Sequence, residues 1–291
     1  MKFLPRRAPG ASPQLSVIIG VKNGAATLQR CLDSIAAQDI PAREVIVIDS
    51  ASIDGTRELL EANQRAGKVT DYVSEPDGGL YEAWNKGVRR SRGEWICFLG
   101  CDDAFHDASA ARRLLEGAAA SGREPRIVYG LVHRVTERGV IAETWGEPWA
   151  AARAPCFAGF SIPHPGSLHH RSIFEERGLY DESYRIAGDY EMFLRELLLR
   201  DPVFVDHVVV DMRFGGMLAP GRDLPHPAGS AARARGARAA RQTRTVAPGA
   251  DHGMDRLLDP AVLRGTRLLP LRRPVPGSAR QAQDLDRLGA P

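Results

Sequence analysis

Residues 95–105 read WICFLGCDDAF, and the rest of the chain can be interpreted outward from them. Six residues apolar enough for a buried strand end in two adjacent carboxylates, Asp102 and Asp103. Like charges in contact repel each other, and taking them out of water costs free energy, so a third group should compensate them. Two explanations are open: the pair caps a helix that begins near Asp107, or it binds a divalent cation.

Three further strand candidates precede this one: LSVIIG (15–20), EVIVID (44–49) and DYVSEP (71–76). Helical patterns lie between them. From Leu28 to Ile35, apolar residues recur at the spacing of one helix face, and residues 80–90 predict another helix. Strand, turn and helix in repetition predict an α/β fold with a mostly parallel sheet and helices on both faces.

The second half of the chain has a less regular pattern. Residues 126–145 predict a β-hairpin, residues 189–199 an amphipathic helix, and residues 203–214 a last pair of strands. After Pro220 the periodicity disappears, and alanine, arginine, proline and glycine dominate. We therefore expect a flexible N-terminal extension (1–13), one globular domain (14–219) and a disordered low-complexity tail (220–291).

The positive charge of the chain is concentrated in that tail. The formal net charge is +3, but residues 220–291 hold 13 arginines against six aspartates, which leaves the preceding residues mildly acidic. No stretch approaches the ~18 uninterrupted apolar residues of a membrane span, and the four cysteines lack the spacing of a metal site or disulfide framework. These features predict a cytoplasmic protein with free cysteines.

Four carboxylates lie at or just after the ends of predicted strands: Asp49, Asp77, Asp102 and Asp103. Open α/β sheets bind ligands at the carboxyl ends of their strands, so these side chains are expected around one crevice. A nucleotide sugar carries a pyrophosphate, whose charge Mg²⁺ or Mn²⁺ can neutralise when one or two carboxylates hold the ion. The pattern therefore suits a nucleotide-diphosphate ligand with a metal.

Four segments resemble family 2 glycosyltransferases in order and spacing: LSVIIGVKNGAATLQRCLDSI, VIVIDSASIDGT, SEPDGGLYEAWNKGVRRSRGEWICFLGCDD and HHRSIFEERGLYDESYRIAGDYEMFLREL. The similarity covers roughly residues 14–217 and is greatest to bacterial enzymes of exopolysaccharide, O-antigen and colanic-acid-type synthesis. It implies a GT-A fold, a nucleotide-diphospho-sugar donor, a Mn²⁺ or Mg²⁺ cofactor and inversion at the anomeric carbon. The implied acceptor is a glycan or a lipid-linked glycan in cell-surface polysaccharide synthesis.

The resemblance also implies roles for single residues. Those expected to bind the nucleotide sugar are Val21, Asn23, Asp49, Ser50, Asp77, Lys86 and Asp102. Those expected to hold the metal are Asp102 and Asp103. Asp189 matches the catalytic base, Glu191 is the second candidate for that role, and His164 is expected on the acceptor side. Structural roles stay open beside these, because Asp189 can cap its helix and Lys86 can be a solvated lysine.

Three departures from the family's pattern affect the expected donor and base contacts. DSAS (49–52) stands where DDGS is common, VKN (21–23) where VYN is typical, and Gly188 where a glutamate often precedes the base. These changes loosen the expected contacts without removing a principal group.

Two other functions are compatible with parts of the sequence. One is a sugar nucleotidyltransferase, although GVKNGAA (20–26) is a poor phosphate-binding loop for it. The other is a non-catalytic glycan- or nucleic-acid-binding protein that uses the basic tail. No nucleic-acid partner is expected, because the tail lacks a binding motif and interleaved aromatic residues. The tail either contacts anionic lipid at the inner face of the cell membrane or has no partner.

Overall fold

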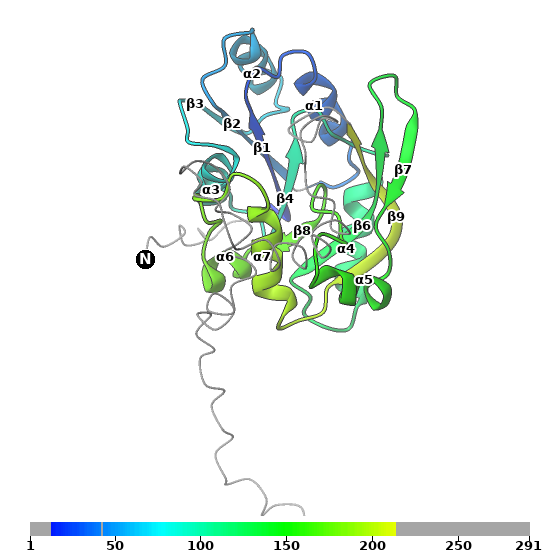
Figure 1. The fold of residues 1–291 in the computed structure, drawn as a ribbon. Coiled ribbons are helices and arrows are strands. Elements are labelled where there is room, and N and C mark those ends of the chain that lie inside the picture. Colours follow the sequence, from blue (N-terminus) through cyan, green and yellow to red (C-terminus); the bar gives the residue numbers. More distant parts are fainter. Residues whose placement is uncertain (1–12, 42, 214–291) are drawn as a thin grey trace, which may run out of the picture. The chain divides into compact units, whose positions relative to one another are not determined.

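The computed structural model describes residues 13–41 and 43–213. Nine strands form one sheet in the order β3-β2-β1-β4-β8-β6-β9-β5, with β7 paired to β6 (Figure 1). The strands are β1 (Leu15–Val21), β2 (Arg43–Asp49), β3 (Asp71–Ser74), β4 (Trp95–Gly100), β5 (Ala104–Phe105), β6 (Ile127–Val135), β7 (Ile141–Trp145), β8 (Leu168–His170) and β9 (Val203–Arg213). The expected tail, and all but residue 13 of the expected N-terminal extension, lie outside the described residues.

Seven helices accompany these strands in the described part of the chain. They are α1 (Leu28–Ala36), α2 (Thr56–Arg65), α3 (Leu80–Arg90), α4 (Ala110–Ala120), α5 (Trp149–Cys156), α6 (Ser172–Arg177) and α7 (Gly188–Leu197). Strands β1, β2, β3 and β4 are parallel to their neighbours within this group, and α1, α2 and α3 connect them in turn. The predicted repetition of strand, turn and helix is therefore confirmed.

Helices cover both faces of the parallel strands. Val17 and Ile19 of β1 point to the face where α1 and α4 contribute to the largest apolar cluster. Ile18 points to the other face, where it packs so closely against Gly87 of α3 that a Cβ there would clash with it. Because both faces are buried, β1, β2 and β4 are nearly continuous apolar runs, which is why the sequence predicts them well.

The second half of the sheet is largely antiparallel. The predicted hairpin is confirmed as β6 and β7, whose residues pair from Val132–Trp145 to Val135–Ile141. The predicted strand pair at 203–214 is wrong, because β9 is a single strand that runs parallel to β6. The register with β6 shifts beside Asp206 and His207, which is typical of a bulge inside a strand.

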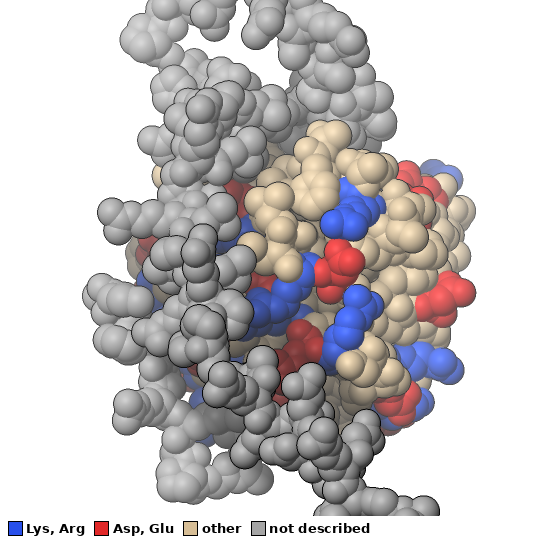
Figure 2. Space-filling view, turned by 90° about the horizontal axis from the view of Figure 1, so that it is seen from below, with Lys and Arg blue, Asp and Glu red and all other residues tan. Residues whose placement is uncertain are grey.

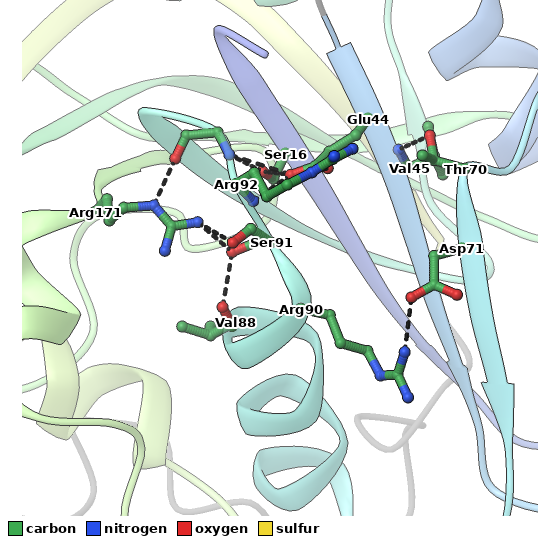
Figure 3. A network of polar contacts seen from close by, with 11 residues as sticks. Ser16, Glu44, Val45, Thr70, Asp71, Val88, Arg90, Ser91, Arg92 and Arg171 are labelled. Carbon is green, nitrogen blue, oxygen red and sulfur yellow. Dashed lines mark hydrogen bonds and ion pairs between the residues drawn. The ribbon is translucent and has the colours of Figure 1, made fainter. Parts of the chain in front are cut away.

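A buried polar network connects the amino ends of three strands (Figure 3). The candidate site lies at the other ends of these strands. Glu44 of β2 is 3% exposed and accepts hydrogen bonds from Ser16 Oγ of β1 at 2.6 Å and from Gly93 N at 3.1 Å. Arg92 Nε donates to the other carboxylate oxygen at 3.1 Å, and Arg171 Nε donates to Gly93 O at 2.8 Å. The start of β4 is thus tied to β1 and β2.

The distribution of exposed charges and the state of the cysteines can be seen in the described residues. Acidic and basic side chains are mixed on the face shown in Figure 2, where the described residues form no broad area of one sign. All four cysteines are free, as predicted. No helix within residues 13–41 and 43–213 combines the length and the apolar character needed to cross a bilayer.

Candidate active site

The carboxyl ends of β1, β2 and β4 meet at one edge of the sheet. Val21 and Asp49 are register partners at the ends of β1 and β2, and Gly100 ends β4 opposite Gly20. The strand order reverses between β1 and β4, which is the switch point where open α/β sheets bind ligands. Asp102 lies two residues after the end of β4, so Asp49 and Asp102 both lie at or just after strand ends on this edge.

Asp102 and Asp103 share a space that a glycine keeps open. A Cβ placed on Gly100 would lie 2.8 Å from Asp102 Oδ1 and 2.8 Å from Asp103 Oδ2. Asp103 is 5% exposed and accepts hydrogen bonds from the backbone N–H groups of Gly100 at 3.2 Å and Arg213 at 3.3 Å. Burial, followed by the neighbouring Asp102 carboxylate, raises the pKa of Asp103 to about 7.

This arrangement fits a divalent cation. Two carboxylate ligands from adjacent aspartates suit Mg²⁺ or Mn²⁺, which keep further positions for water and substrate phosphates. A bound cation would also remove the repulsion that raises the pKa of Asp103. Within the part of the chain that the structure describes, no third histidine, cysteine or carboxylate joins this pair as a ligand.

Asp49 is fully buried and fixes the loop after β2. Ser52 donates to it through both its backbone N–H and its hydroxyl, and Ser74 Oγ of β3 donates at 2.6 Å. Both carboxylate oxygens therefore have donors from the protein. The predicted contact between Asp49 and the nucleoside stays a prediction, and the structure adds that Asp49 shapes residues 50–52 around it.

Ser50 and Asp77 come together although 27 positions separate them. Ser50 Oγ donates to Asp77 Oδ1 at 3.0 Å, and Gly79 N donates to the same oxygen at 3.1 Å. The other oxygen, Asp77 Oδ2, is buried and has no hydrogen-bond partner among the described residues. A buried acceptor without a donor is rare in a folded protein and calls for a partner such as a ligand N–H group.

The predicted first-loop residues lie against the loop after β2. Val21 O accepts from Ser50 N at 2.8 Å. Asn23 has a φ of 52°, donates from its N–H to Ser52 Oγ at 2.7 Å, and accepts from Ile53 N at 3.0 Å. These bonds hold the two loops together at the edge of the sheet, with Ile53 itself 92% exposed.

Lys86 forms ion pairs with two nearby glutamates. Its Nζ lies 2.9 Å from Glu75 Oε1 and 3.1 Å from Glu82 Oε1. Burial opposes the charged form, but the hydrogen bonds to Glu75 and Glu82 outweigh it and raise the pKa of Lys86. Lys86 therefore keeps its charge beside the loop that holds Asp77, and its contact with phosphates stays a prediction.

Asp189 lies in the first turn of α7 and faces Tyr81 of α3. The Tyr81 hydroxyl donates to Asp189 Oδ1 at 3.3 Å and accepts from Gly188 N at 2.8 Å. Burial raises the pKa of Asp189 to about 6. Glu191 is held differently, because Arg195 donates to both of its carboxylate oxygens. Of the two candidate bases, Asp189 is the one without a cationic partner among the described residues.

His164 lies within a cluster of aromatic rings. It is 3% exposed, its Nε2 lies 3.1 Å from the Tyr180 hydroxyl, and its ring stacks on Trp84 at 5.0 Å between centroids. Burial lowers the pKa of His164 well below its ordinary value. Its expected contact with the acceptor stays a prediction, and in the described structure its ring is part of the core beside α3.

Known proteins are similar to this chain in sequence and in fold. Residues 16–137 match the family described as Glycosyl transferase family 2. A relative named "PGL/p-HBAD biosynthesis glycosyltransferase" from Mycobacterium bovis is 32% identical over 217 aligned positions, which cover 71% of this chain and 80% of the relative. This chain belongs to glycosyl transferase family 2.

A further relative and a structural neighbour are less similar in sequence. An uncharacterized glycosyltransferase of Mycobacterium tuberculosis is 29% identical, covering 71% of this chain and 78% of that relative. The crystal structure of S. aureus TarS 1–349 in complex with UDP-GlcNAc has a TM-score of 0.58 at 19% identity, and covers 73% of this chain and 62% of that chain. That likeness supports the predicted α/β GT-A fold. Family membership makes the protein a glycosyltransferase, which sets aside both alternative functions.

Two positions that depart from the usual family 2 residues show what each departure does to the local structure. Ala51, where glycine is usual, has a φ of 50°, a left-handed conformation that costs a non-glycine residue roughly 1–2 kcal/mol. Gly188, where glutamate is frequent, packs against Tyr81 so closely that a Cβ would lie 2.8 Å from two ring atoms. The missing side chain at 188 therefore makes room for the ring whose hydroxyl contacts Asp189.

The sequence does not predict the supporting residues of this site. Gly100 and Tyr81 are the principal omissions. The sequence does contain a signal for Gly100, which is its position between a buried strand and an acidic pair. No signal in a single sequence pairs Tyr81 with Asp189, because 108 positions separate them.

Proposed function

We propose that this glycosyltransferase moves a sugar from a nucleotide-diphospho-sugar donor to a glycan or lipid-linked glycan acceptor, with inversion at the anomeric carbon and with Mn²⁺ or Mg²⁺. The observation that carries the proposal is the pair of carboxylates around Gly100 at the switch point of the sheet. The complex of TarS with UDP-GlcNAc supports a nucleotide-sugar donor for this fold. A lipid-linked acceptor would bring the enzyme to the cytoplasmic face of the membrane.

The nucleoside would bind along the loops that follow β1, β2 and β3. Asp77 Oδ2, buried and without a donor, is placed to accept an N–H of the base or a ribose hydroxyl. Ser50 holds the other Asp77 oxygen, while Val21, Asn23 and Asp49 fix the loops on either side. These residues would orient the nucleotide so that its diphosphate points toward the end of β4.

Asp102 and Asp103 would hold the cation beside the diphosphate. When bound, the ion supplies positive charge that stabilises the departing nucleotide diphosphate. Lys86 would add a second positive charge on the donor side, after exchanging Glu75 or Glu82 for a phosphate oxygen. The raised pKa of Asp103 implies that protons compete with the cation for this carboxylate below about pH 7.

Asp189 would take the proton from the attacking acceptor hydroxyl. Its pKa of about 6 leaves it ionised at neutral pH yet basic enough to accept a proton, which suits a general base. Inversion requires attack from the face opposite the leaving diphosphate, so the acceptor must lie on the α7 side of the sugar. Glu191, paired with Arg195, is the second candidate for the base. His164 would contact the acceptor from the cluster of aromatic rings that includes Trp84.

A thermal-shift panel tests the donor and metal claims together. The full chain is melted with UDP, GDP or ADP, each with and without Mn²⁺, beside Asp103→Asn and the exposed control Asp206→Asn. We expect at least one nucleotide to raise the melting temperature of the wild type and Asp206→Asn only when Mn²⁺ is present, because a ligand of the native state stabilises it. Asp103→Asn should lose that shift. Equal shifts without Mn²⁺, or an unchanged shift in Asp103→Asn, would refute the metal claim.

A further inference from the structure

We propose that His106, His133 and Asp211 form a second metal site, for Zn²⁺ or a similar divalent transition-metal ion, separate from Asp102 and Asp103. His106 Nδ1 lies 2.9 Å and His133 Nδ1 lies 3.4 Å from Asp211 Oδ1. The three potential ligand atoms all lie within 4.8 Å of one another. Two imidazoles and one carboxylate are a ligand set suited to zinc and related ions.

The sheet register places these three side chains on one face. His133 of β6 and Asp211 of β9 are register partners, and Ala104 of β5 pairs with Asp211 from the other side. His106 lies two positions after Ala104, and its N–H donates to Val209 O at 3.0 Å, so the pairing with β9 continues to it. Residues two apart in a strand share a face, which gathers the three side chains around Asp211.

The spacing agrees with ligands of one small ion. Metal–ligand bonds of about 2.0–2.1 Å in a tetrahedral zinc site separate neighbouring ligand atoms by about 3.3 Å. The two distances to Asp211 Oδ1 lie close to this value on either side. Small rotations of the histidine rings, which lie 5.0 Å apart between centroids at 84°, would complete the geometry.

Hydrogen bonding alone leaves one of these atoms without a partner. His106 satisfies Asp211, but His133 Nδ1 is buried and has no hydrogen-bond partner among the described residues. The His133 side chain is 15% exposed, and this nitrogen lies 3.4 Å from the same carboxylate oxygen, which is an ion pair only when the imidazole is protonated. A buried imidazole nitrogen that makes no hydrogen bond, close to two other potential ligand atoms, is explained by a cation between them.

The site would join three segments, one of which, β9, also supports Asp103. His106 follows β5, His133 lies on β6, and Asp211 lies on β9 two residues before Arg213, whose N–H donates to Asp103. A metal here would therefore hold the end of β9 in place against β5 and β6. Its chemistry differs from that of the Asp102–Asp103 pair, because imidazole favours zinc-like ions while paired carboxylates favour Mg²⁺ and Mn²⁺.

The full chain offers a matched control for the test. His207 Nε2 lies 2.9 Å from Asp107 Oδ2, a histidine–aspartate pair with no third ligand among the described residues. Zn²⁺ stoichiometry is measured by calorimetry, and Co²⁺ absorption reports nitrogen ligands in a tetrahedral site. Variants are His133→Ala, the more exposed His106→Gln and the control His207→Ala, each checked for fold by circular dichroism. Zn²⁺ bound elsewhere in the chain is common to all of them.

We expect the wild type and His207→Ala to bind one more equivalent of Zn²⁺ than His106→Gln and His133→Ala, and to show the Co²⁺ bands that the two variants lack. Asp103→Asn should keep the Co²⁺ bands, which separates this site from the proposed catalytic cation. Equal Zn²⁺ stoichiometry in the wild type and a folded His106→Gln, or a wild type without tetrahedral Co²⁺ bands, would overturn the proposal.

Discussion

The Asp189 carboxylate lies 3.3 Å from the Tyr81 hydroxyl, and burial raises its pKa to about 6. If it is the base, Asp189→Asn should lower kcat by about 10²–10⁴-fold and leave nucleotide binding intact. Sugar transfer and nucleotide thermal shifts measure the two effects, with Asp206→Asn as the surface control. Normal transfer by a folded Asp189→Asn, together with loss in Glu191→Gln, would move the base to Glu191.

Tyr81 is expected to set the pH at which that base works. At a Mn²⁺ concentration high enough to saturate the Asp102–Asp103 pair, the wild-type kcat/KM should fall as pH drops through about 6, because a protonated Asp189 cannot accept a proton. The hydrogen bond from Tyr81 lowers the pKa of Asp189, so Tyr81→Phe should move this acid limb to higher pH. The variant should also lose about 1–3 kcal/mol of stability, since Gly188 N loses its acceptor. An unchanged pH profile with only lower stability would reduce Tyr81 to a structural role.

Residue types at the site are easier to predict than their partners. Strand ends and the family resemblance place Asp49, Asp102 and Asp103 at one edge, and the structure agrees. Neither signal shows that Lys86 pairs with Glu75 and Glu82, or that His164 is 3% exposed. Such contacts depend on how distant segments pack, which no local pattern in one sequence records.

The end of β4 is the element on which the metal claim depends. In Gly100→Ala, the new Cβ would meet both carboxylates at 2.8 Å and push them apart. We expect activity to need a Mn²⁺ concentration higher by about tenfold or more, as for changes that disturb metal ligands. Gly139→Ala is the matched control, because its φ of 77° strains the backbone of the hairpin turn while nothing lies within 4 Å of the added Cβ. Gly139→Ala should be less stable than the wild type but should need the same Mn²⁺ concentration for activity. If Gly100→Ala also needs only the wild-type Mn²⁺ concentration, the proposed role of Gly100 is contradicted.

Elements with strong local patterns were predictable, and those formed by pairing were not. The strands β1, β2 and β4 are buried on both faces, so their apolar runs stand out. The strands β5 and β8 have two and three residues, and only their neighbours in the sheet stabilise them. The predicted strand pair is the single strand β9, whose pairing with β6 is interrupted by shifts in register.

At the scale of the whole molecule, the described residues end at Arg213 and include every residue proposed to bind the donor. Deletion of residues 220–291 should therefore leave the Mn²⁺-dependent thermal shift by a nucleotide diphosphate within experimental error of the full chain. The same shortened protein, added to vesicles with anionic lipid, reports whether the arginine-rich tail contributes to membrane contact. Loss of the nucleotide response in a folded truncation would assign part of the donor site to the tail.

The Glu44 network has a practical consequence for engineering donor preference. It clamps the starts of β1, β2 and β4 with buried hydrogen bonds, far along each strand from the loops at 22–25 and 50–53. Randomised libraries at the exposed loop positions Lys22 and Ile53 should consequently yield many folded clones, whereas libraries around Ser16 and Glu44 should yield few. Selection for new sugar nucleotides can thus start from one end of the sheet while the other remains untouched as the scaffold.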